Sequence, residues 1–263
     1  MQPWNLARTN YGVVKQQNYE VAVLPLGATE PHNLHLPYGT DLFEGDVVGE
    51  KICEAAWNNG GKVVLLPTIP YGTENNMHQF PLAMNIDPLT LFQIIRDLID
   101  SLLNSGIRKI VLLNSHGGNE LRPLLRELNG KSDAHLFLCN WFSCFNDVYH
   151  EIFDQAEDHA GEMETSFGLA YFPELVARDP SDPEKLAADD GVTRKSQFEA
   201  LNQGWVSMSR PWHLLTSNSG SGNPHAATAE KGQQMMDVLV ERIGGFLVEL
   251  SQAEINEHFP YNV

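Results

Sequence analysis

The sequence lacks the features that mark secreted, membrane-spanning and nucleic-acid-binding proteins. Its 263 residues include only three cysteines, Cys53, Cys139 and Cys144, with no CxxC pair, so we expect no disulfide framework. Only 17 Lys and Arg oppose 34 Asp and Glu, which disfavours contact with a phosphate backbone, so we expect no nucleic-acid partner. No apolar run approaches the ~18 residues of a membrane helix, and the first residues lack a basic patch followed by an apolar block. We therefore expect a cytoplasmic protein with no membrane partner.

The sequence does contain an alternation of short apolar runs with amphipathic segments. This pattern is typical of an α/β fold with a mostly parallel sheet. The apolar runs show no polar alternation, which suits strands that are buried on both faces. The predicted strands are Val21–Leu26, Val63–Leu66, Ile110–Leu113 and His135–Leu138.

Three long helices are predicted from apolar residues that recur at helical spacing. They cover residues 42–57, 88–105 and 226–250. Asp87 stands at the capping position before the second of them. Residues 180–222 are rich in Asp, Ser and Asn, and we predict an irregular excursion or lid there. Because the last helix is apolar enough to need the same core, we expect residues 1–263 to form a single domain.

A dense group of polar side chains directly follows the first predicted strand. Residues 27–41 read GATEPHNLHLPYGTD and contain Glu30, His32, His35 and Asp41. In open α/β sheets, ligands bind in the crevice at the carboxyl ends of the strands. Carboxylate and imidazole donors in one loop suit zinc or manganese. The alternative is an ordinary solvated loop in which Asp41 caps the helix that follows.

A second polar segment follows the predicted strand Ile110–Leu113. It reads NSHGGN over residues 114–119, and it places His116 at the edge that holds the first group, provided that the two strands are neighbours. The adjacent glycines Gly117 and Gly118 allow the backbone to approach a ligand closely. The same features also fit a glycine nest that binds an anion such as phosphate at a helix N-terminus.

A third segment, HAGEMETS over residues 159–166, opens a further predicted helix. His159 and Glu162 would share one face of that helix, whereas Glu162 and Glu164 cannot both point the same way. One carboxylate could then ligate a metal or move a proton while the other caps the helix or faces solvent. The alternative is that both acidic residues only complement the helix dipole.

Together, these segments resemble the motifs of the creatininase family. Residues 30–41 match E-x-H-x-x-H-L-P-x-x-T-D, residues 114–119 match N-x-H-G-G-N, and residues 159–166 match H-A-G-x-x-E-T-S. Residues 220–232 are similar to a late G-x-x-G-[DN]-P-x-x-A-[ST]-x-E-K-G motif, with one residue fewer between the first glycines. The resemblance covers nearly the whole chain in the right order.

The resemblance implies a three-layer α/β/α sandwich with a mostly parallel central sheet and a dinuclear metal site. Carried over by position, Glu30, Asp41 and His116 would hold one metal ion. His32 and Asp41 would hold the other, so that Asp41 bridges the pair. The implied cofactors are two divalent metal ions, with Zn²⁺ first and Mn²⁺ or Fe²⁺ as alternatives.

The sequence departs from the family pattern at the second metal. In creatininase a glutamate two residues past the motif histidine completes that site, and Gly118 stands there in this chain. Glu162 is the first candidate to replace the ligand, and Glu164 is the second. His159 matches a histidine proposed to protonate the leaving nitrogen, and Glu164 is the other candidate for proton chemistry. His35 either orients a metal ligand or is a packed loop histidine.

The implied function is hydrolysis of a carbon–nitrogen bond other than a peptide bond by a metal-activated water. The substrate would be a small-molecule cyclic amide or formamide. Residues 74–82 depart from the family stretch S-x-E-H-x-x-F-P-G-T, so creatinine itself is not expected. The alternatives are a mononuclear zinc hydrolase that processes peptides and a non-catalytic protein that binds metal or phosphate. Family members commonly form hexamers, so a homo-oligomer is expected by resemblance.

Overall fold

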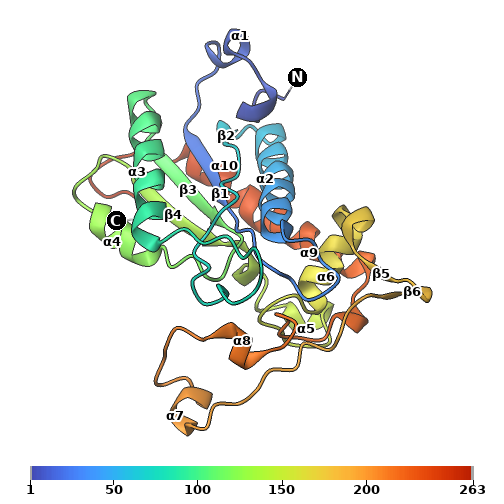
Figure 1. Cartoon of the computed structure of the whole chain (residues 1–263). Helices are drawn as coiled ribbons and strands as arrows, with labels where there is room; N and C mark the ends of the chain where they lie inside the picture. The colour runs from blue at the N-terminus through green and yellow to red at the C-terminus, as the bar shows by residue number, and fades with distance from the viewer. Residues whose placement is uncertain (1, 262–263) are drawn as a thin grey trace.

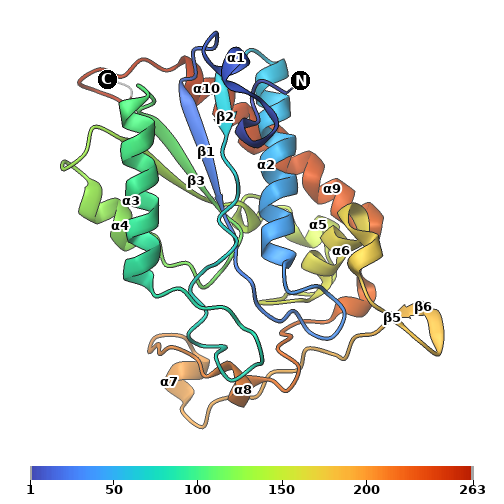
Figure 2. The same cartoon turned by 45° about the horizontal axis from the view of Figure 1, so that its top comes forward.

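The computed structural model describes residues 2–261, and its central feature is a sheet of four parallel strands. The spatial order of the strands is β2-β1-β3-β4. Their bounds are β1 Val21–Leu26, β2 Val63–Leu65, β3 Lys109–Asn114 and β4 His135–Asn140. Because the strands are parallel, their carboxyl ends meet at one edge of the sheet, which lies toward the bottom of Figures 1 and 2.

Helices cover both faces of the sheet (Figure 1). On one face lie α3, Pro88–Asn104, and α4, Arg122–Leu128; on the other lie α2, Thr40–Asn58, α9, Ala229–Leu239, and α10, Gly245–Gln252. Successive β1 residues alternate between the two cores: Ala22 packs with the α3 side and Val23 with the α2 side. This arrangement confirms the predicted α/β/α sandwich with a parallel sheet.

Strand β4 differs from the prediction. Its residues are half-buried throughout, whereas the apolar run had predicted a strand buried on both faces. The reason is its position at the edge of the sheet, beyond β3, where one side has no neighbouring strand.

The helix boundaries also differ from the predictions in ways that affect the site. Helix α2 begins at Thr40, so Asp41 lies inside the first turn and Gly39 holds the capping position. The Asp41 side chain is therefore free to point into the site. Asp87 does precede α3, but its side chain makes no capping hydrogen bond. The last helical segment, from α9 to α10, contains a π-helical turn at Val240–Gly244.

Several short elements complete the chain. They are η1 Leu6–Arg8, α1 Tyr11–Val14, η2 Trp141–Ser143, α5 Tyr149–Ile152, α6 Glu162–Tyr171 and η3 Pro173–Leu175, followed by β5 Arg178–Asp179, β6 Asp182–Leu186, α7 Glu199–Asn202, α8 Trp212–Leu215 and η4 Pro224–Ala226. Helices α7 and α8 lie beyond the carboxyl ends of the strands in both views (Figures 1 and 2). None of the described helices has the length and apolar character needed to cross a membrane.

Candidate metal centre

The loop between β1 and α2 returns to the end of the strand that it leaves. Gly27 packs against the backbone of Asp41, where a Cβ atom would lie 2.9 Å from the Asp41 carbonyl group. Any side chain at position 27 would push α2 away from β1. Glycine at this position therefore lets Asp41 lie beside the carboxyl end of the strand.

One group of donor atoms surrounds His116. Its Nδ1 atom lies 3.0 Å from Glu30 Oε1 and 3.0 Å from Asp41 Oδ2. All three residues are buried. Separations of this size between donors suit ligands that share a cation at bond lengths of about 2.0–2.2 Å. The structure thus brings together three residues that lie far apart in the sequence.

A second group of donor atoms surrounds His32. Its Nε2 atom lies 3.0 Å from Asp41 Oδ1 and 3.7 Å from Glu164 Oε2. Asp41 therefore presents one carboxylate oxygen to each group. This is the geometry that a bridging carboxylate needs.

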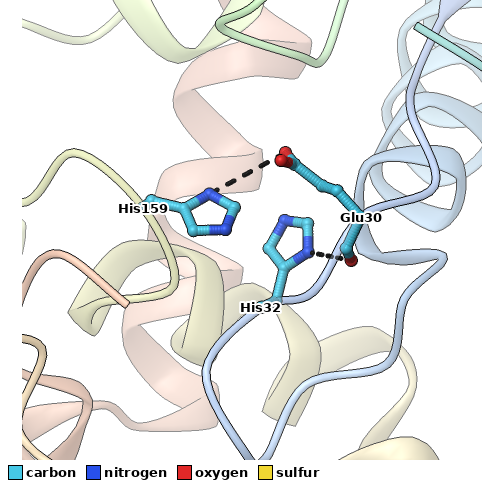
Figure 3. Close-up of side chains that lie close together, drawn as sticks. All are labelled: Glu30, His32 and His159. Carbon is cyan, nitrogen blue, oxygen red and sulfur yellow. Dashed lines mark hydrogen bonds and ion pairs between the residues drawn. The ribbon is translucent and has the colours of Figure 1, made fainter. Parts of the chain in front are cut away.

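Hydrogen bonds on the outer side of each imidazole fix which ring nitrogen faces the centre. His32 Nδ1 donates to the backbone carbonyl of Glu30 at 3.0 Å (Figure 3). His116 Nε2 lies 3.2 Å from the carbonyl of Thr73 and contacts the carboxylate of Glu74. Both outer nitrogens thus carry a proton, and the inner nitrogens, Nε2 of His32 and Nδ1 of His116, can act as ligands.

The electrostatics of the cluster favour bound positive charge. Burial alone would lower the pKa of His32, but the Asp41 carboxylate raises it to about 10. Burial would raise the pKa of Asp41, yet the adjacent His32 and His116 hold it well below its usual range. Burial raises the pKa of Glu30. Protonated imidazoles thus neutralise the negative charge of the carboxylates, and a divalent cation could neutralise that charge instead.

Buried carboxylate oxygens provide a further test of whether these residues suit a bound cation. Glu30 Oε2 has no hydrogen-bond partner in the structure, and Asp41 Oδ2 has only the His116 imidazole, at 3.0 Å. Leaving such atoms unpaired is costly unless a cation or another ligand supplies the missing interaction. Donor atoms of Glu30, His32 and His159 also lie within 4.8 Å of one another, as do those of Glu30, Glu74 and His116. The donor set, three carboxylates and two or three imidazoles, fits a zinc-type or manganese-type ion.

Glu162, the first candidate for the missing ligand, points away from this centre. Its carboxylate accepts hydrogen bonds from the backbone N–H groups of Asp154, at 3.0 Å, and Gln155, at 2.8 Å. It also pairs with the ammonium group of Lys231. These interactions satisfy Glu162 on the far side of α6, so the expectation that it ligates the second metal is corrected.

Glu164 is the carboxylate of this segment that faces the centre. Besides its approach to His32, it accepts a 2.7 Å hydrogen bond from the backbone N–H of Ala160. Burial raises the pKa of Glu164 to about 7. Gly118, by contrast, leaves no room for a family-type glutamate, because a Cβ atom there would lie 2.3 Å from His116 Nε2.

His159 precedes α6, so it does not share a helical face with Glu162 as the spacing predicted. Its Nε2 atom donates to the carbonyl of Pro31 at 2.9 Å, which leaves Nδ1 facing Glu30 Oε1 at 3.9 Å (Figure 3). Burial, together with the nearby His32, lowers the pKa of His159 to about 3. Its backbone pairs with Ser221, which belongs to the late motif. The imidazole is therefore neutral and presents a lone pair toward the centre.

Sequence reasoning missed two carboxylates and left His35 open. Glu74 follows the Tyr71-Gly72 pair downstream of β2, and its position beyond a strand end was the available signal. Glu44 lies one turn after Asp41 on α2, so helical spacing could have placed it on the same face. His35 Nε2 lies 2.8 Å from Thr165 Oγ1, and it supports the segment that carries Glu164 rather than contacting Glu30 or Asp41.

The centre opens into a cavity of about 350 Å³. Its wall includes aromatic side chains and several carboxylates beyond the ligand candidates. These lining residues include Glu44, Ser115, Trp141, Glu157, Arg210 and Trp212. Arg210 belongs to the segment 187–218. It pairs with Asp158, which lies outside that segment, at 2.6 Å, and it lies over the Trp212 ring. A cavity of this size accommodates a small molecule or one end of a longer one.

Comparison with known proteins places the chain among hydrolases. The family model described as creatinine amidohydrolase matches residues 7–247. A mycofactocin precursor peptide peptidase from Mycobacterium ulcerans is 29% identical over 84% of this chain and 83% of its own. A creatinine amidohydrolase from Pseudomonas putida is 27% identical over 60% of this chain and 67% of its own.

Solved structures agree with the observed fold. A Bacteroides fragilis protein provisionally assigned as a creatinine amidohydrolase shares 34% identity, with a TM-score of 0.87 over 98% of this chain and 100% of the other. Creatininase structures at 21% identity, which show a shared fold, include a manganese form and a Zn–Zn form. Their TM-scores are 0.75 and 0.76, and each comparison covers 96% of this chain and 100% of the other.

Proposed function

This chain belongs to the creatininase family, and from that premise we propose that it is a metal-dependent hydrolase of a small-molecule amide. The observation that carries the proposal is the pair of donor groups that share Asp41. Glu30, Asp41 and His116 would hold one divalent ion, while His32, Asp41 and Glu164 would hold a second. Zn²⁺ and Mn²⁺ suit these nitrogen and oxygen donors, and Fe²⁺ is an alternative.

The chain's own residues supply the remaining parts of the reaction. A divalent ion in such a site lowers the pKa of bound water and polarises a carbonyl oxygen. His159 is neutral, and its Nδ1 atom faces the centre, so it can accept a proton and pass it to the departing nitrogen. Glu164 is assigned to the second ion, so proton transfer falls to His159. Ser221 holds the His159 backbone in place.

A peptide substrate is the second candidate function. The peptide peptidase from M. ulcerans matches more of this chain, and at slightly higher identity, than the creatinine amidohydrolase does. Both substrate classes contain an amide carbonyl and a nitrogen leaving group, so the same residues could act on either. We place small-molecule amides first because a cavity of about 350 Å³ can hold a small amide whole but only one end of a peptide.

We also propose that the chain forms a homo-oligomer in the cytoplasm. Segment 187–218 exposes several large apolar side chains, which supports self-association. They include Val192, Phe198, Trp205 and Met208. All three cysteines are free thiols, which suits a reducing compartment.

Metal titration and a substrate screen test the catalytic proposal. Metal-free protein is titrated with Zn²⁺, Mn²⁺ or Fe²⁺, and bound metal is measured by elemental analysis. We expect more than one equivalent per chain, together with hydrolysis of one class among formamides, cyclic amides and short peptides. Binding of a single ion with peptide cleavage would favour the mononuclear alternative, and absence of metal binding would refute the proposal.

A further inference from the structure

A tryptophan outside the metal centre contacts the imidazole to which we assign proton transfer. Trp212 lies on α8, and its indole packs against the His159 ring in a T-shaped arrangement. The ring centroids are 5.9 Å apart, and the ring planes are inclined at 87°. The Trp212 residue is 3% exposed, and it lines the cavity of the centre. The reaction proposed above gives it no role.

The hydrogen bond made by His159 fixes one atom of its ring but not the plane of the ring. Nε2 donates to the Pro31 carbonyl at 2.9 Å, which leaves Nδ1 as the nitrogen without a proton. This bond alone would still allow the imidazole to turn and carry Nδ1 away from Glu30 (Figure 3). Two neighbouring rings oppose such a turn. They are His32, with 4.2 Å between the centroids, and Trp212.

Trp212 is itself held by three contacts. Its indole N–H donates to the Ser219 carbonyl at 2.6 Å, and its backbone N–H donates to the Asn76 carbonyl at 3.0 Å. The Arg210 guanidinium carbon lies 4.5 Å from the centre of the indole ring. An indole that is anchored in this way presents a fixed surface to His159, in one of the geometries that aromatic pairs prefer.

The contacts of Trp212 and His159 converge on Ser219. The Ser219 carbonyl accepts the indole N–H, and its hydroxyl donates at 2.8 Å to the Pro31 carbonyl that also accepts from His159 Nε2. Ser219 is fully buried, and its φ of +68° lies in the left-handed region that residues with a side chain rarely adopt. Backbone strain of this kind persists only where the surrounding structure fixes the residue. The indole and the imidazole are therefore attached to one rigid point.

We propose that Trp212 is a positioning residue for His159 and holds the imidazole in the plane in which Nδ1 faces the metal centre. The inference rests on the proposed function, because that function assigns proton transfer to His159. A displacement of about 1 Å at a reacting group can lower a rate about 100-fold. The segment 187–218 thus contributes to the reaction through a side chain that transfers no proton itself.

Two other roles for Trp212 lead to different expectations. A tryptophan that binds substrate directly would mainly affect KM, and it would do so whether or not His159 is present. A tryptophan that only stabilises the fold would leave the His159 imidazole in place in every variant that folds. A positioning residue instead affects kcat, and only while His159 is there to be positioned.

A double-mutant cycle tests the proposal in the metal-loaded protein. The constants kcat and KM are measured for the wild type, Trp212→Leu, His159→Ala and the double variant, with a substrate from the screen above. Trp212→Phe keeps an aromatic ring beside the imidazole but lacks the indole N–H. Leu214→Ala, which changes a side chain that is 58% exposed on the same helix, is the matched control.

We expect Trp212→Leu to lower kcat about 10–100-fold and to change KM less than about 3-fold. In the His159→Ala background the same substitution should change kcat less than about 2-fold. Trp212→Phe should restore most of the lost kcat, and Leu214→Ala should match the wild type. Equal losses of kcat in both backgrounds, or a change confined to KM, would overturn the proposal.

Crystal structures of metal-free wild type and Trp212→Leu test the position of the imidazole without metal or substrate. We expect His159 Nδ1 to turn away from Glu30 Oε1 in the variant, beyond the 3.9 Å of the wild type. An imidazole that keeps its plane in Trp212→Leu would contradict the positioning role. If Trp212→Leu folds poorly, Trp212→Phe replaces it in the cycle, with an expected loss of kcat of about 3-fold that disappears in the His159→Ala background.

These measurements also separate the two proposals. Absence of metal binding or of hydrolysis by the wild type contradicts the catalytic proposal, while the crystal structures still test whether Trp212 positions His159. Normal metal content with an unmoved imidazole and an unchanged kcat in Trp212→Leu contradicts the positioning role alone.

Discussion

Two irregular regions of the molecule differ in which side chains they bury and which they expose. The loop over residues 27–39 is mostly buried although it carries charged side chains such as Glu30 and His32. The segment over residues 187–218 is mostly exposed although it carries apolar ones such as Trp205, which is 75% exposed. Buried charge needs a counter-charge, whereas exposed apolar surface needs a covering surface. We therefore propose bound ions for the first region and association with another surface for the second.

The two regions meet at Ser219. Its hydroxyl donates to the carbonyl of Pro31 at 2.8 Å and accepts from the backbone N–H of Asn33 at 2.9 Å. Ser219, the residue directly after the exposed segment, thus stabilises the buried loop. Substitutions in each region can test whether the buried loop binds metal and whether the exposed segment mediates association.

The largest effect is expected from Asp41→Asn. Asp41 supplies one oxygen to each donor group, so the amide should weaken both. We expect bound metal to fall and activity to drop more than ~100-fold, beyond the loss typical of an outer partner. Elemental analysis and steady-state kinetics measure the two effects. Glu54→Gln, exposed on the same helix, is the control, and full metal retention by Asp41→Asn would refute the bridging role.

Glu74→Gln should produce the next largest effect. Glu74 contacts the outer nitrogen of His116, and it orients the imidazole whose inner nitrogen faces the centre. Loss of such a partner lowers metal affinity about 10–100-fold. Competition with a chelator measures the affinity. The exposed Glu120→Gln is the control, and an unchanged affinity in Glu74→Gln would show that the carboxylate does not orient His116.

Glu162→Gln should affect the stability of the fold, whereas Glu164→Gln should affect metal binding. Glu162 is fully buried against Lys231, so its neutral replacement should lower the free energy of unfolding by about 2–3 kcal/mol while bound metal is retained. Glu164→Gln should instead weaken the second ion. Urea unfolding and metal titration of both variants provide the test. Loss of metal in Glu162→Gln would reverse the assignment.

Acid should destabilise the metal-free protein through His35. Burial lowers its pKa from 6.5 to about 3, so between these values the unfolded chain binds a proton that the folded one does not. The free energy of unfolding should therefore fall by about 1–2 kcal/mol from pH 7 to pH 5. His35→Gln should flatten this dependence in urea unfolding, whereas His213→Gln, exposed on α8, should not. An unaltered slope in His35→Gln would contradict the assignment.

The smallest effect on stability is expected from Trp205→Ser. The side chain is 75% exposed, so the free energy of unfolding should change by less than about 0.5 kcal/mol. The mass in solution, measured by light scattering, should decrease because an apolar contact is lost. The neighbouring Gln203→Ala should leave the mass unchanged. A monomeric wild type would contradict the association that we propose.

The sequence predicted those parts of the fold that depend on local pattern. The apolar runs located all four strands of the main sheet within a few residues, and helical spacing located α2, α3 and the α9–α10 segment. It did not show that β4 lies at the edge, since strand order depends on how distant segments pair. The capping role of the Asp87 side chain was also misjudged, because the same residue types act as caps or as free side chains.

The candidate site divides in the same way. The candidate metal donors in residues 30–41, 114–119 and 159–166 could be predicted from the sequence, because motif spacing and predicted strand ends identify them. The choice between Glu162 and Glu164 could not be predicted, since Lys231, which is distant in the sequence, pairs with Glu162 outside the centre. Glu74 was missed for a similar reason: its partner His116 lies on another strand end.

The sequence by itself determined the family motifs, the α/β alternation and the stock of carboxylate and imidazole donors. Only the tertiary structure decided which donors meet, which nitrogen of each imidazole faces inward, and which buried polar atoms remain unpaired beside them. The physical reason is that composition and periodicity act over a few residues along the chain. Coordination geometry and burial depend instead on side chains that folding brings together from distant segments.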